Sequence, residues 1–577
     1  MSKKYTDEKN AQIIVTLLKK HGIRKIVASP GTTNMAFVGS VQSDAYFEVY
    51  SCADERSAAY MACGLSEEAG EPVVLSCTGA TASRNYLPAL TEAFYRKLPV
   101  CAITSSQPVG RAGHHSPQML DRSSPPVDTV KLSVQLPIVK DANDEWECNV
   151  KVNQALLELK RRGGGPVHIN LPTLYSRNFN VTSLPDTRMI ERISMEDAFP
   201  QLKGRVAIFI GSHSKISDSL IREIDDFCSA NDAVVFCDHT SGYKGKYRVL
   251  WSLVSAQKVS WSESQPDVLI HIGEISGAYM NVTGSHVWRV SEDGEIRDTF
   301  KKLRYVFEMS ESKFFRHYTN TGTGNGTDSY LKRCNEILER LRARIPEVPF
   351  SNIWAASKLS VCLPKKSALH LGILNSLRSW NFFEIPTSVD AYSNVGGFGI
   401  DGGVSSLIGA SFANREKLFF GVIGDLAFFY DMNSLGNRHI GNNLRLFLVN
   451  NGRGTEFKNF NHPCAAFGED ANAYMAAAGH YGNKSPHLVK HYAEALGFEY
   501  LCASNKEEFE KVYLRFVTPE QTARPILFEV FTTDTDESQA LKMVMSIEEG
   551  TETKAKEIAK NLLGTTGVAF AKKILGK

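Results

Sequence analysis

Two short stretches in the last third of the chain pair a carboxylate with carboxamides. The apolar run 417–423 stops at Gly424-Asp425, and the apolar run 444–449 stops at Asn450-Asn451. The 24 residues between Asp425 and Asn450 are enough for a helical crossover between neighbouring parallel strands. Because ligands bind at the carboxyl ends of parallel strands, we expect both polar stretches to meet at one binding edge.

These residue types suit a divalent cation that holds a diphosphate. Mg²⁺ prefers oxygen ligands and usually shares them with a phosphate. Asp425 offers a carboxylate, Asn451 an amide oxygen and Arg453 a backbone carbonyl, so these are the predicted metal ligands. Gly424 and Gly452 let the backbone approach a diphosphate closely. The alternative is that Asp425 caps a helix and the asparagines form a turn.

Strand-like apolar runs that alternate with helical patterns must position these residues. The runs cover residues 23–29, 72–76, 99–105 and 165–172, then 204–212, 233–238 and 267–274, then 367–373, 417–425, 444–451 and 524–532. This alternation predicts α/β domains with doubly wound parallel sheets. Turn-rich residues 180–189 and glycine-rich residues 320–329 are typical of linkers. We predict three domains and a lysine-rich helical tail, at residues 1–188, 189–345, 346–549 and 550–577.

Composition narrows the class of protein. A chain of 577 residues is too long for one hydrophobic core. Lys and Arg number 65 against 63 Asp and Glu, so charge gives no support for nucleic-acid binding. Eleven cysteines without metal-finger spacing suit reduced thiols, and no apolar run reaches the roughly 18 residues of a membrane helix. The N-terminus lacks the apolar stretch of a signal peptide, so we expect a cytoplasmic protein without a nucleic-acid or membrane partner.

The motif resembles that of the thiamine-diphosphate (ThDP) enzymes, which runs Gly-Asp, about two dozen residues, then Asn-Asn. Residues 29–37, 54–108 and 163–172 are similar to the pyrimidine-binding domain of that family. The resemblance implies a pyrimidine-binding domain at 1–188, a central Rossmann-like domain and a diphosphate-binding domain at 346–549. It also implies ThDP and Mg²⁺ as cofactors. The central domain lacks a GxGxxG turn, so bound FAD is not expected.

Glu55 is the catalytic residue that the resemblance assigns most specifically. A carboxyl group hydrogen-bonded to the pyrimidine of ThDP favours the tautomer that takes the proton from the thiazolium, while the chemistry belongs to the cofactor. Without the other motifs, Glu55 is better explained as a solvated glutamate at a helix N-terminus, where the helix dipole favours it. The family pattern assigns further residues to cofactor binding, with Ile400 supporting a bent cofactor and Ser376 touching the diphosphate. The full cofactor set is Glu55, Ser376, Ile400, Gly424, Asp425, Leu426, Asn451 and Gly452.

Within that family the chain most resembles the menaquinone-pathway synthases, which add decarboxylated 2-oxoglutarate to isochorismate. Three arginines that such enzymes use for substrate carboxylates are replaced here by Thr33, Gln107 and Val395. Arginine is the natural bidentate partner of a carboxylate, so their loss predicts different substrates. The candidates that remain for substrate binding are Thr32, Thr33, Arg84, Arg111 and Arg453.

The loop at residues 110–123 carries the adjacent histidines His114 and His115, with Gln118 close behind. Such a pair resembles that of simple 2-oxo-acid decarboxylases, where it handles proton transfer, and histidine titrates near neutrality. We therefore add all three residues to the predicted catalytic set. The alternative is a surface loop with two solvated histidines.

The resemblance implies an enzyme that decarboxylates a 2-oxo acid and transfers the acyl-anion equivalent to an acceptor. A simple decarboxylase that releases an aldehyde is one alternative. An inactive scaffold with a ThDP-enzyme fold is a more remote one. In the family, the domains that flank one cofactor come from different subunits, which implies a homodimer or a dimer of dimers with sites across the interface.

This assembly predicts complementation between two inactive variants. If Glu55→Gln and Asp425→Ala subunits exchange, a mixed dimer pairs the intact Glu55 of one chain with the intact Asp425 of the other. One of its two sites should then regain activity. Mass spectrometry follows the exchange and turnover follows the rescue. Complete exchange without any activity would show that each site is built within a single chain.

Overall fold

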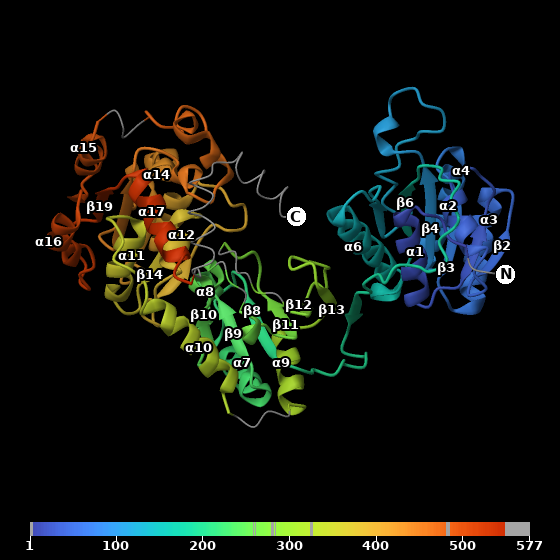
Figure 1. The fold of residues 1–577 in the computed structure, drawn as a ribbon, viewed down its shortest axis with the longest axis horizontal. Helices are drawn as coiled ribbons and strands as arrows, with labels where there is room; N and C mark the ends of the chain where they lie inside the picture. Colours follow the sequence, from blue (N-terminus) through green and yellow to red (C-terminus); the bar gives the residue numbers. More distant parts are fainter. Residues whose placement is uncertain are drawn as a thin grey trace, which may run out of the picture. The chain divides into compact units, whose positions relative to one another are not determined.

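The computed structural model describes residues 4–257, 259, 261–277, 282, 284–322, 327–480 and 485–548. The predicted tail at 550–577 lies outside these residues. The chain divides into two compact units, the first from residues 1–199 and 286–309 and the second from 200–285 and 310–577 (Figure 1). Within the described residues, none of the helices has the combination of length and apolar character that crossing a bilayer requires.

The first unit contains a six-stranded parallel sheet in the order β2-β1-β3-β4-β6-β5. Its strands are β1 (Lys25–Ala28), β2 (Glu48–Ser51), β3 (Val73–Thr78), β4 (Val100–Ser106), β5 (Leu132–Gln135) and β6 (Val167–Pro172). Its helices are α1 (Lys9–Lys20), α2 (Met35–Val41), α3 (Glu55–Ala69), α4 (Thr81–Asn85), α5 (Leu87–Arg96) and α6 (Ala142–Glu158), with short 3₁₀ turns η1 (Val109–Arg111) and η2 (Arg161–Gly163).

Successive side chains along the strands point to opposite faces of this sheet, and each face has its own hydrophobic core. Val74 packs with α1, α2 and α6, whereas its neighbours Val73 and Leu75 pack with α3 and α5. Successive side chains of a strand point to opposite faces, so a continuously apolar strand supplies both cores at once. The sheet is therefore doubly wound, as the apolar runs predict.

The second unit repeats this arrangement with the sheet order β15-β14-β16-β17-β19-β18. The strands of this sheet are β14 (Ala368–Leu371), β15 (Asp390–Tyr392), β16 (Phe419–Gly424), β17 (Leu444–Asn450), β18 (Glu499–Ala503) and β19 (Ile526–Phe531). Its α-helices are α11 (Asn352–Leu359), α12 (Asn375–Trp380), α13 (Gly403–Ala413), α14 (Asp425–Asp431), α15 (Leu488–Ala495), α16 (Lys506–Phe516) and α17 (Asp534–Met545). Its 3₁₀ turns are η5 (Ser360–Cys362), η6 (Met432–Gly436), η7 (Thr455–Lys458) and η8 (Pro463–Ala471).

Counted from the first strand of each sheet, both orders read 2-1-3-4-6-5. The chain leaves β14 toward β15 on one side and then enters β16 on the other side. This reversal creates a topological switch point between β14 and β16. In open α/β sheets, such a point leaves a crevice outside the carboxyl ends of the strands, where ligands bind.

A third parallel sheet is formed by strands of the middle segment. The second unit holds β8 (Val206–Ile210), β9 (Val234–Cys237), β10 (Arg248–Leu250) and β11 (Val268–Ile272), in the order β10-β9-β8-β11. The first unit holds β7 (Glu191–Ile193), β12 (His286–Val290) and β13 (Leu303–Phe307), in the order β12-β13-β7. The remaining elements are α7 (Asp218–Asn231), α8 (Ser252–Ala256), α9 (Glu311–Asn320), α10 (Ser329–Arg342), η3 (His239–Ser241) and η4 (Ser262–Ser264).

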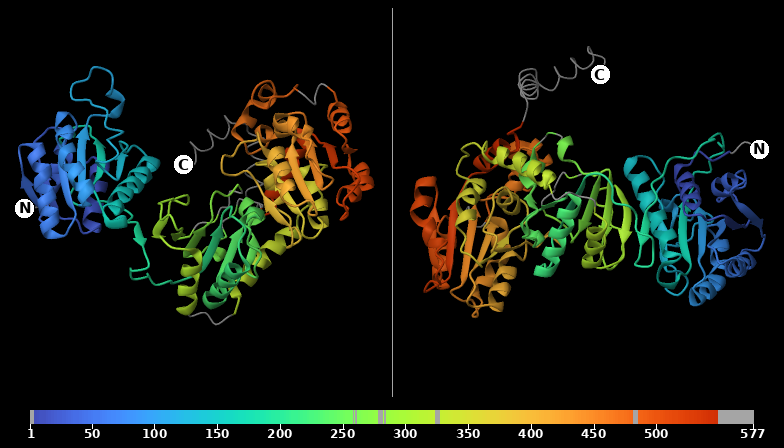
Figure 2. Two further views of the ribbon diagram at one scale, coloured as in Figure 1. Left: turned by 180° about the vertical axis from the view of Figure 1, so that it is seen from behind. Right: turned by 90° about the horizontal axis from the view of Figure 1, so that it is seen from below.

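The predicted fold class is confirmed, because the structure contains three parallel sheets with flanking helices. Figure 2 shows from two further sides how helices accompany the strands in each unit. Aromatic side chains hold α11 and α16 to one face of the last sheet, where Trp354 and Phe447 both contact Phe509. The opposite face packs against α13, α14 and α15.

Candidate active site

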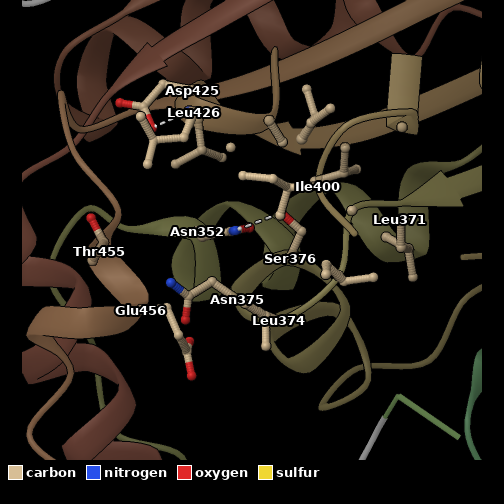
Figure 3. Close-up of a pocket in the computed structure, with 18 of the residues that line it drawn as sticks. Asn352, Leu371, Leu374, Asn375, Ser376, Ile400, Asp425, Leu426, Thr455 and Glu456 are labelled. Atoms are coloured by element: carbon tan, nitrogen blue, oxygen red, sulfur yellow. Dashed lines mark hydrogen bonds between the residues drawn. The ribbon is translucent and has the colours of Figure 1, made fainter. Parts of the chain in front are cut away.

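A pocket in the second unit lies at the switch point between β14 and β16 (Figure 3). It is a cavity of about 170 Å³. Residues 372–376, which follow β14, line it together with residues 424–427, which include the end of β16 and the start of α14. Asn451, directly after β17, completes this rim. The pocket is therefore located where the strand order of the sheet predicts a ligand.

Asp425 is held at this edge by the register of two neighbouring strands. Gly424 of β16 pairs with Val449 of β17, so the residues that follow them emerge side by side. The Asp425 carboxylate accepts hydrogen bonds from the backbone N–H groups of Asn451 at 3.2 Å and Gly452 at 2.5 Å. Burial raises the pKa of Asp425 to about 6, although the backbone N–H donors act in the opposite direction and lower the pKa. The carboxyl group is therefore mostly ionised at neutral pH.

Three buried side-chain oxygens around the pocket are available to contact a ligand. The Oδ1 atoms of Asn451 and Asn352 and the Oγ1 atom of Thr455 are buried and have no hydrogen-bond partner among the described residues. All three residues line the pocket. A buried polar group without a partner costs about 1–3 kcal/mol, so a cation or a donor group bound here would offset that cost.

The pocket has room for a phosphate group beside the backbone. A Cβ atom built on Gly424 meets no atom within 4 Å, so the space next to this glycine is open. Among the described residues, no cluster of three or more His, Cys, Asp or Glu could hold a metal alone. A cation beside Asp425 would therefore draw on amide, backbone and phosphate oxygens, which is the ligand set that Mg²⁺ favours with phosphates.

The structure brings most of the predicted cofactor residues to this one pocket. Those that line it are Ser376, Ile400, Gly424, Asp425, Leu426 and Asn451, and Arg453, a predicted metal ligand, lines it too. Gly452 joins them through its hydrogen bond to Asp425. The hydroxyl group of Ser376 accepts a hydrogen bond from the Asn352 amide at 3.3 Å, and Ile400 is half-buried in the loop before α13 (Figure 3).

Arg453 differs from the free cation that the sequence suggests. Its guanidinium donates to the Asp534 carboxylate and to the Asn472 amide oxygen, both at 3.0 Å. The side chain is therefore paired within its own unit. Its roles in substrate and metal binding stay predictions.

Sequence reasoning missed Glu537, a second buried carboxyl group that lines the pocket. It accepts hydrogen bonds from the Asn352 N–H at 2.9 Å and the Thr532 hydroxyl at 2.8 Å. Burial raises the pKa of Glu537 to about 7. The signal was present, because the acidic stretch 534–537 follows β19 just as Asp425 follows β16.

Glu55 lies in the first unit, at the first position of α3. This helix begins there because the Asp54 carboxylate accepts the Ser57 N–H, and it ends at Gly70, whose φ of 64° is left-handed. Glu55 is half-buried, and its Oε2 atom accepts a hydrogen bond of 3.1 Å from the Asn85 amide. Asn85, the last residue of α4, thus orients the carboxyl group that the family pattern singles out.

The predicted loop residues remain on the surface of the first unit. His114, His115 and Gln118 are exposed, and the last two have left-handed φ values of 54° and 64°. Such a backbone costs roughly 1–3 kcal/mol at a non-glycine residue and is enriched at functional sites. Arg111 in the same loop is hydrogen-bonded to Gln107.

The remaining substrate candidates differ in exposure. Thr32 is exposed, whereas Thr33 is buried and its hydroxyl donates to the Ser105 carbonyl at 2.7 Å. Arg84 is exposed, and its guanidinium donates to the Asp121 carbonyl at 2.7 Å. Thr33 therefore has a structural contact that accounts for it without any substrate.

Comparison with known proteins supplies an independent observation. Residues 8–124 match the family model described as "Thiamine pyrophosphate enzyme, N-terminal TPP binding domain". The chain is similar to proteins named 2-succinyl-5-enolpyruvyl-6-hydroxy-3-cyclohexene-1-carboxylate synthase. One from Bacteroides fragilis is 31% identical over 93% of this chain and 98% of the relative. Another from Bacteroides thetaiotaomicron is 32% identical over the same shares, and one from Flavobacterium johnsoniae is 26% identical over 92% and 97%.

The geometry predicts that Asp425→Ala abolishes the Mg²⁺-dependent binding of ThDP, because a bridging cation would lose the negative charge that Asp425 supplies. Calorimetric titration of ThDP with and without Mg²⁺ measures this. The matched control is Asp401→Ala, which removes an exposed carboxylate from the loop before α13 and should leave both titrations unchanged. Full affinity and full Mg²⁺ dependence in Asp425→Ala would place the metal elsewhere.

Proposed function

We propose that this chain, which belongs to the ThDP-dependent 2-oxo-acid decarboxylase and carboligase family, uses ThDP and Mg²⁺ to decarboxylate a 2-oxo acid and to transfer the resulting acyl-anion equivalent to an acceptor. One observation carries the proposal. The buried Asp425 carboxylate and the unpaired Asn451 oxygen lie together at the ends of adjoining strands, in a pocket at the switch point. Relatives over 93% of the chain are named as a synthase, which supports transfer to an acceptor.

Asp425 and Asn451 would hold the cation. Asp425 supplies the negative charge, since its pKa of about 6 leaves it mostly ionised at neutral pH. Its hydrogen bonds to the N–H groups of Asn451 and Gly452 fix the carboxylate without using all of its lone pairs. The Asn451 oxygen, which has no hydrogen-bond partner in the described part of the chain, is the neutral ligand, and the Arg453 carbonyl is the third candidate.

Glu55 would hold a proton at its carboxyl group and share it with the pyrimidine ring of the cofactor. Bound ThDP supplies the nucleophilic carbon and the electron sink for decarboxylation. Asn85 keeps the Glu55 carboxyl in one orientation through its hydrogen bond to Oε2. A carboxyl group held in this way is ready for proton exchange without a search of its rotamers.

The residues around the substrate differ from those expected of the named synthases. Thr33 donates to a backbone carbonyl and Gln107 contacts Arg111, so neither supplies the charge of an arginine. We propose that the donor is still a 2-oxo acid, because decarboxylation is set by the cofactor. The acceptor is proposed to differ, because it depends on these replaced side chains.

We predict that Glu55→Gln loses nearly all turnover but keeps ThDP·Mg²⁺ affinity within roughly tenfold, or about 1.4 kcal/mol. Glutamine keeps the shape of the side chain and its contact with Asn85, but it cannot exchange the proton. Steady-state turnover and calorimetry check the two halves of this prediction. Glu68→Gln, an exposed change on the same helix, should leave both unchanged. Turnover like that of the wild type in Glu55→Gln would remove this residue from the mechanism.

The proposal as a whole is tested by supplying a panel of 2-oxo acids with ThDP and Mg²⁺. CO₂ release measures decarboxylation, and mass spectrometry of the products identifies ligation when acceptors are added. We expect CO₂ release from at least one donor and a ligated product with at least one acceptor. Release of free aldehyde alone would favour the simple decarboxylase. No CO₂ from any donor, despite tight ThDP·Mg²⁺ binding, would favour the inactive scaffold.

A further inference from the structure

A second cleft lies in the first unit, between β4 and β6 on one side and α4, α5 and residues 122–130 on the other. Two arginines, Arg84 and Arg122, are among the residues that line it. Its polar wall carries Ser83, Thr104, Thr129 and His168. None of the described residues that line it is acidic. The cleft is therefore a concentration of positive charge that no lining carboxylate neutralises.

Arg122 is the unusual group in this cleft. The residue is 6% exposed, and its guanidinium donates a hydrogen bond to the Asn170 amide oxygen. The Nε and Nη1 atoms are buried without a hydrogen-bond partner among the described residues. Burial lowers the pKa of Arg122 to about 10, so the guanidinium is still a cation at neutral pH. A buried cation without an anionic partner costs several kcal/mol in general.

The surrounding backbone holds this guanidinium in place. A Cβ atom at Gly79 would overlap Nη1 of Arg122, so the turn after β3 approaches the charged group closely. On the opposite side, Asn170 is itself hydrogen-bonded to Gln135. The free donors of Arg122 are thus fixed before any ligand arrives. Such preorganisation favours binding, because little side-chain entropy remains to be lost.

The other polar groups of the cleft are neutral. Burial lowers the pKa of His168 to about 3, so its ring is uncharged and contacts the hydroxyls of Thr104 at 2.7 Å and Ser133 at 2.8 Å. Asp121, the nearest acidic neighbour in sequence, accepts hydrogen bonds from the backbone and the hydroxyl of Ser123. A single buried charge with neutral neighbours matches an anion of one negative charge.

We propose that this cleft binds the carboxylate of a small organic acid. Arg122 receives the carboxylate on the inside through its free N–H donors, and Arg84 adds a second positive charge at the exposed mouth. Leu87 and Leu90 of α5 line the same cleft and give the aliphatic part of the acid an apolar surface. The inference stands on the unpaired donors of Arg122 and does not depend on the proposed reaction.

The test uses the full chain without added ThDP or Mg²⁺, and butyrate as the probe at constant ionic strength. Calorimetry should give saturable binding to the wild type. Arg122→Gln and Arg84→Gln should each weaken it at least tenfold. Butyramide, which has the same shape without the charge, should not bind. Arg96→Gln is the matched control, because Arg96 is paired with Glu67 on the same unit and away from the lining residues. Equal binding by wild type and Arg122→Gln would overturn the proposal.

Thermal unfolding separates a binding role from a purely structural one. Without butyrate, Arg122→Gln should melt at the same temperature as the wild type or higher, because it removes an uncompensated buried charge. Butyrate should raise the melting temperature of the wild type alone. Two results together would overturn the proposal and show that Arg122 is structural. Arg122→Gln would lose much of its stability, and butyrate would still raise the melting temperature of Arg84→Gln.

Steady-state kinetics of the variants then show whether the bound carboxylate belongs to the substrate or to a separate effector. If the acid is the 2-oxo acid substrate, Arg122→Gln should raise KM for that acid with little change in kcat, and the substrate should displace butyrate. If it is a separate effector, KM should be unchanged and butyrate should still bind at saturating substrate. Inorganic phosphate serves as the comparison anion. Binding of phosphate as tight as that of butyrate would contradict the assignment to a carboxylate.

Discussion

The hydrogen bonds that Asp425 accepts from the chain after β17 are the interaction on which the candidate site depends. They connect the carboxyl ends of two neighbouring strands through one carboxylate. The carboxylate stays ionised near neutrality only because backbone N–H groups oppose the effect of burial on its pKa. Without β17 in register beside β16, Asp425 would have neither these donors nor Asn451 as its neighbour. The sheet therefore determines the electrostatics of the pocket.

Much of this edge could be predicted from sequence, because strand ends are marked by local signals. Apolar runs that stop at Gly424-Asp425 and at Asn450-Asn451 indicate where β16 and β17 end, and parallel sheets leave no choice about which edge that is. Glu537 shows the limit. It also follows a strand, but an acidic stretch at the start of a helix is common, and only the tertiary structure shows that this carboxyl is buried.

Arg122 lay beyond sequence reasoning for a different reason. Nothing in the stretch 121–126 distinguishes a buried arginine from an exposed one, since arginines in loops are usually solvated. Its burial results from the close approach of the turn at Gly79 and from the amide of Asn170, which are distant in sequence. The loop with His114 and His115 is the converse case. The motif predicts chemistry there, yet in the structure both histidines are exposed.

The strand order 2-1-3-4-6-5, present in both units, has a consequence for how such a protein can change over time. Two sheets with the same connectivity each reverse direction between their first and third strands, so the chain has two edges of the kind where ligands bind in open α/β sheets. Changes in function can then be confined to the loops at those edges, with Glu55 behind β2 of one copy and Asp425 behind β16 of the other. The two frameworks share one strand order, while the side chains at their edges can change without altering it.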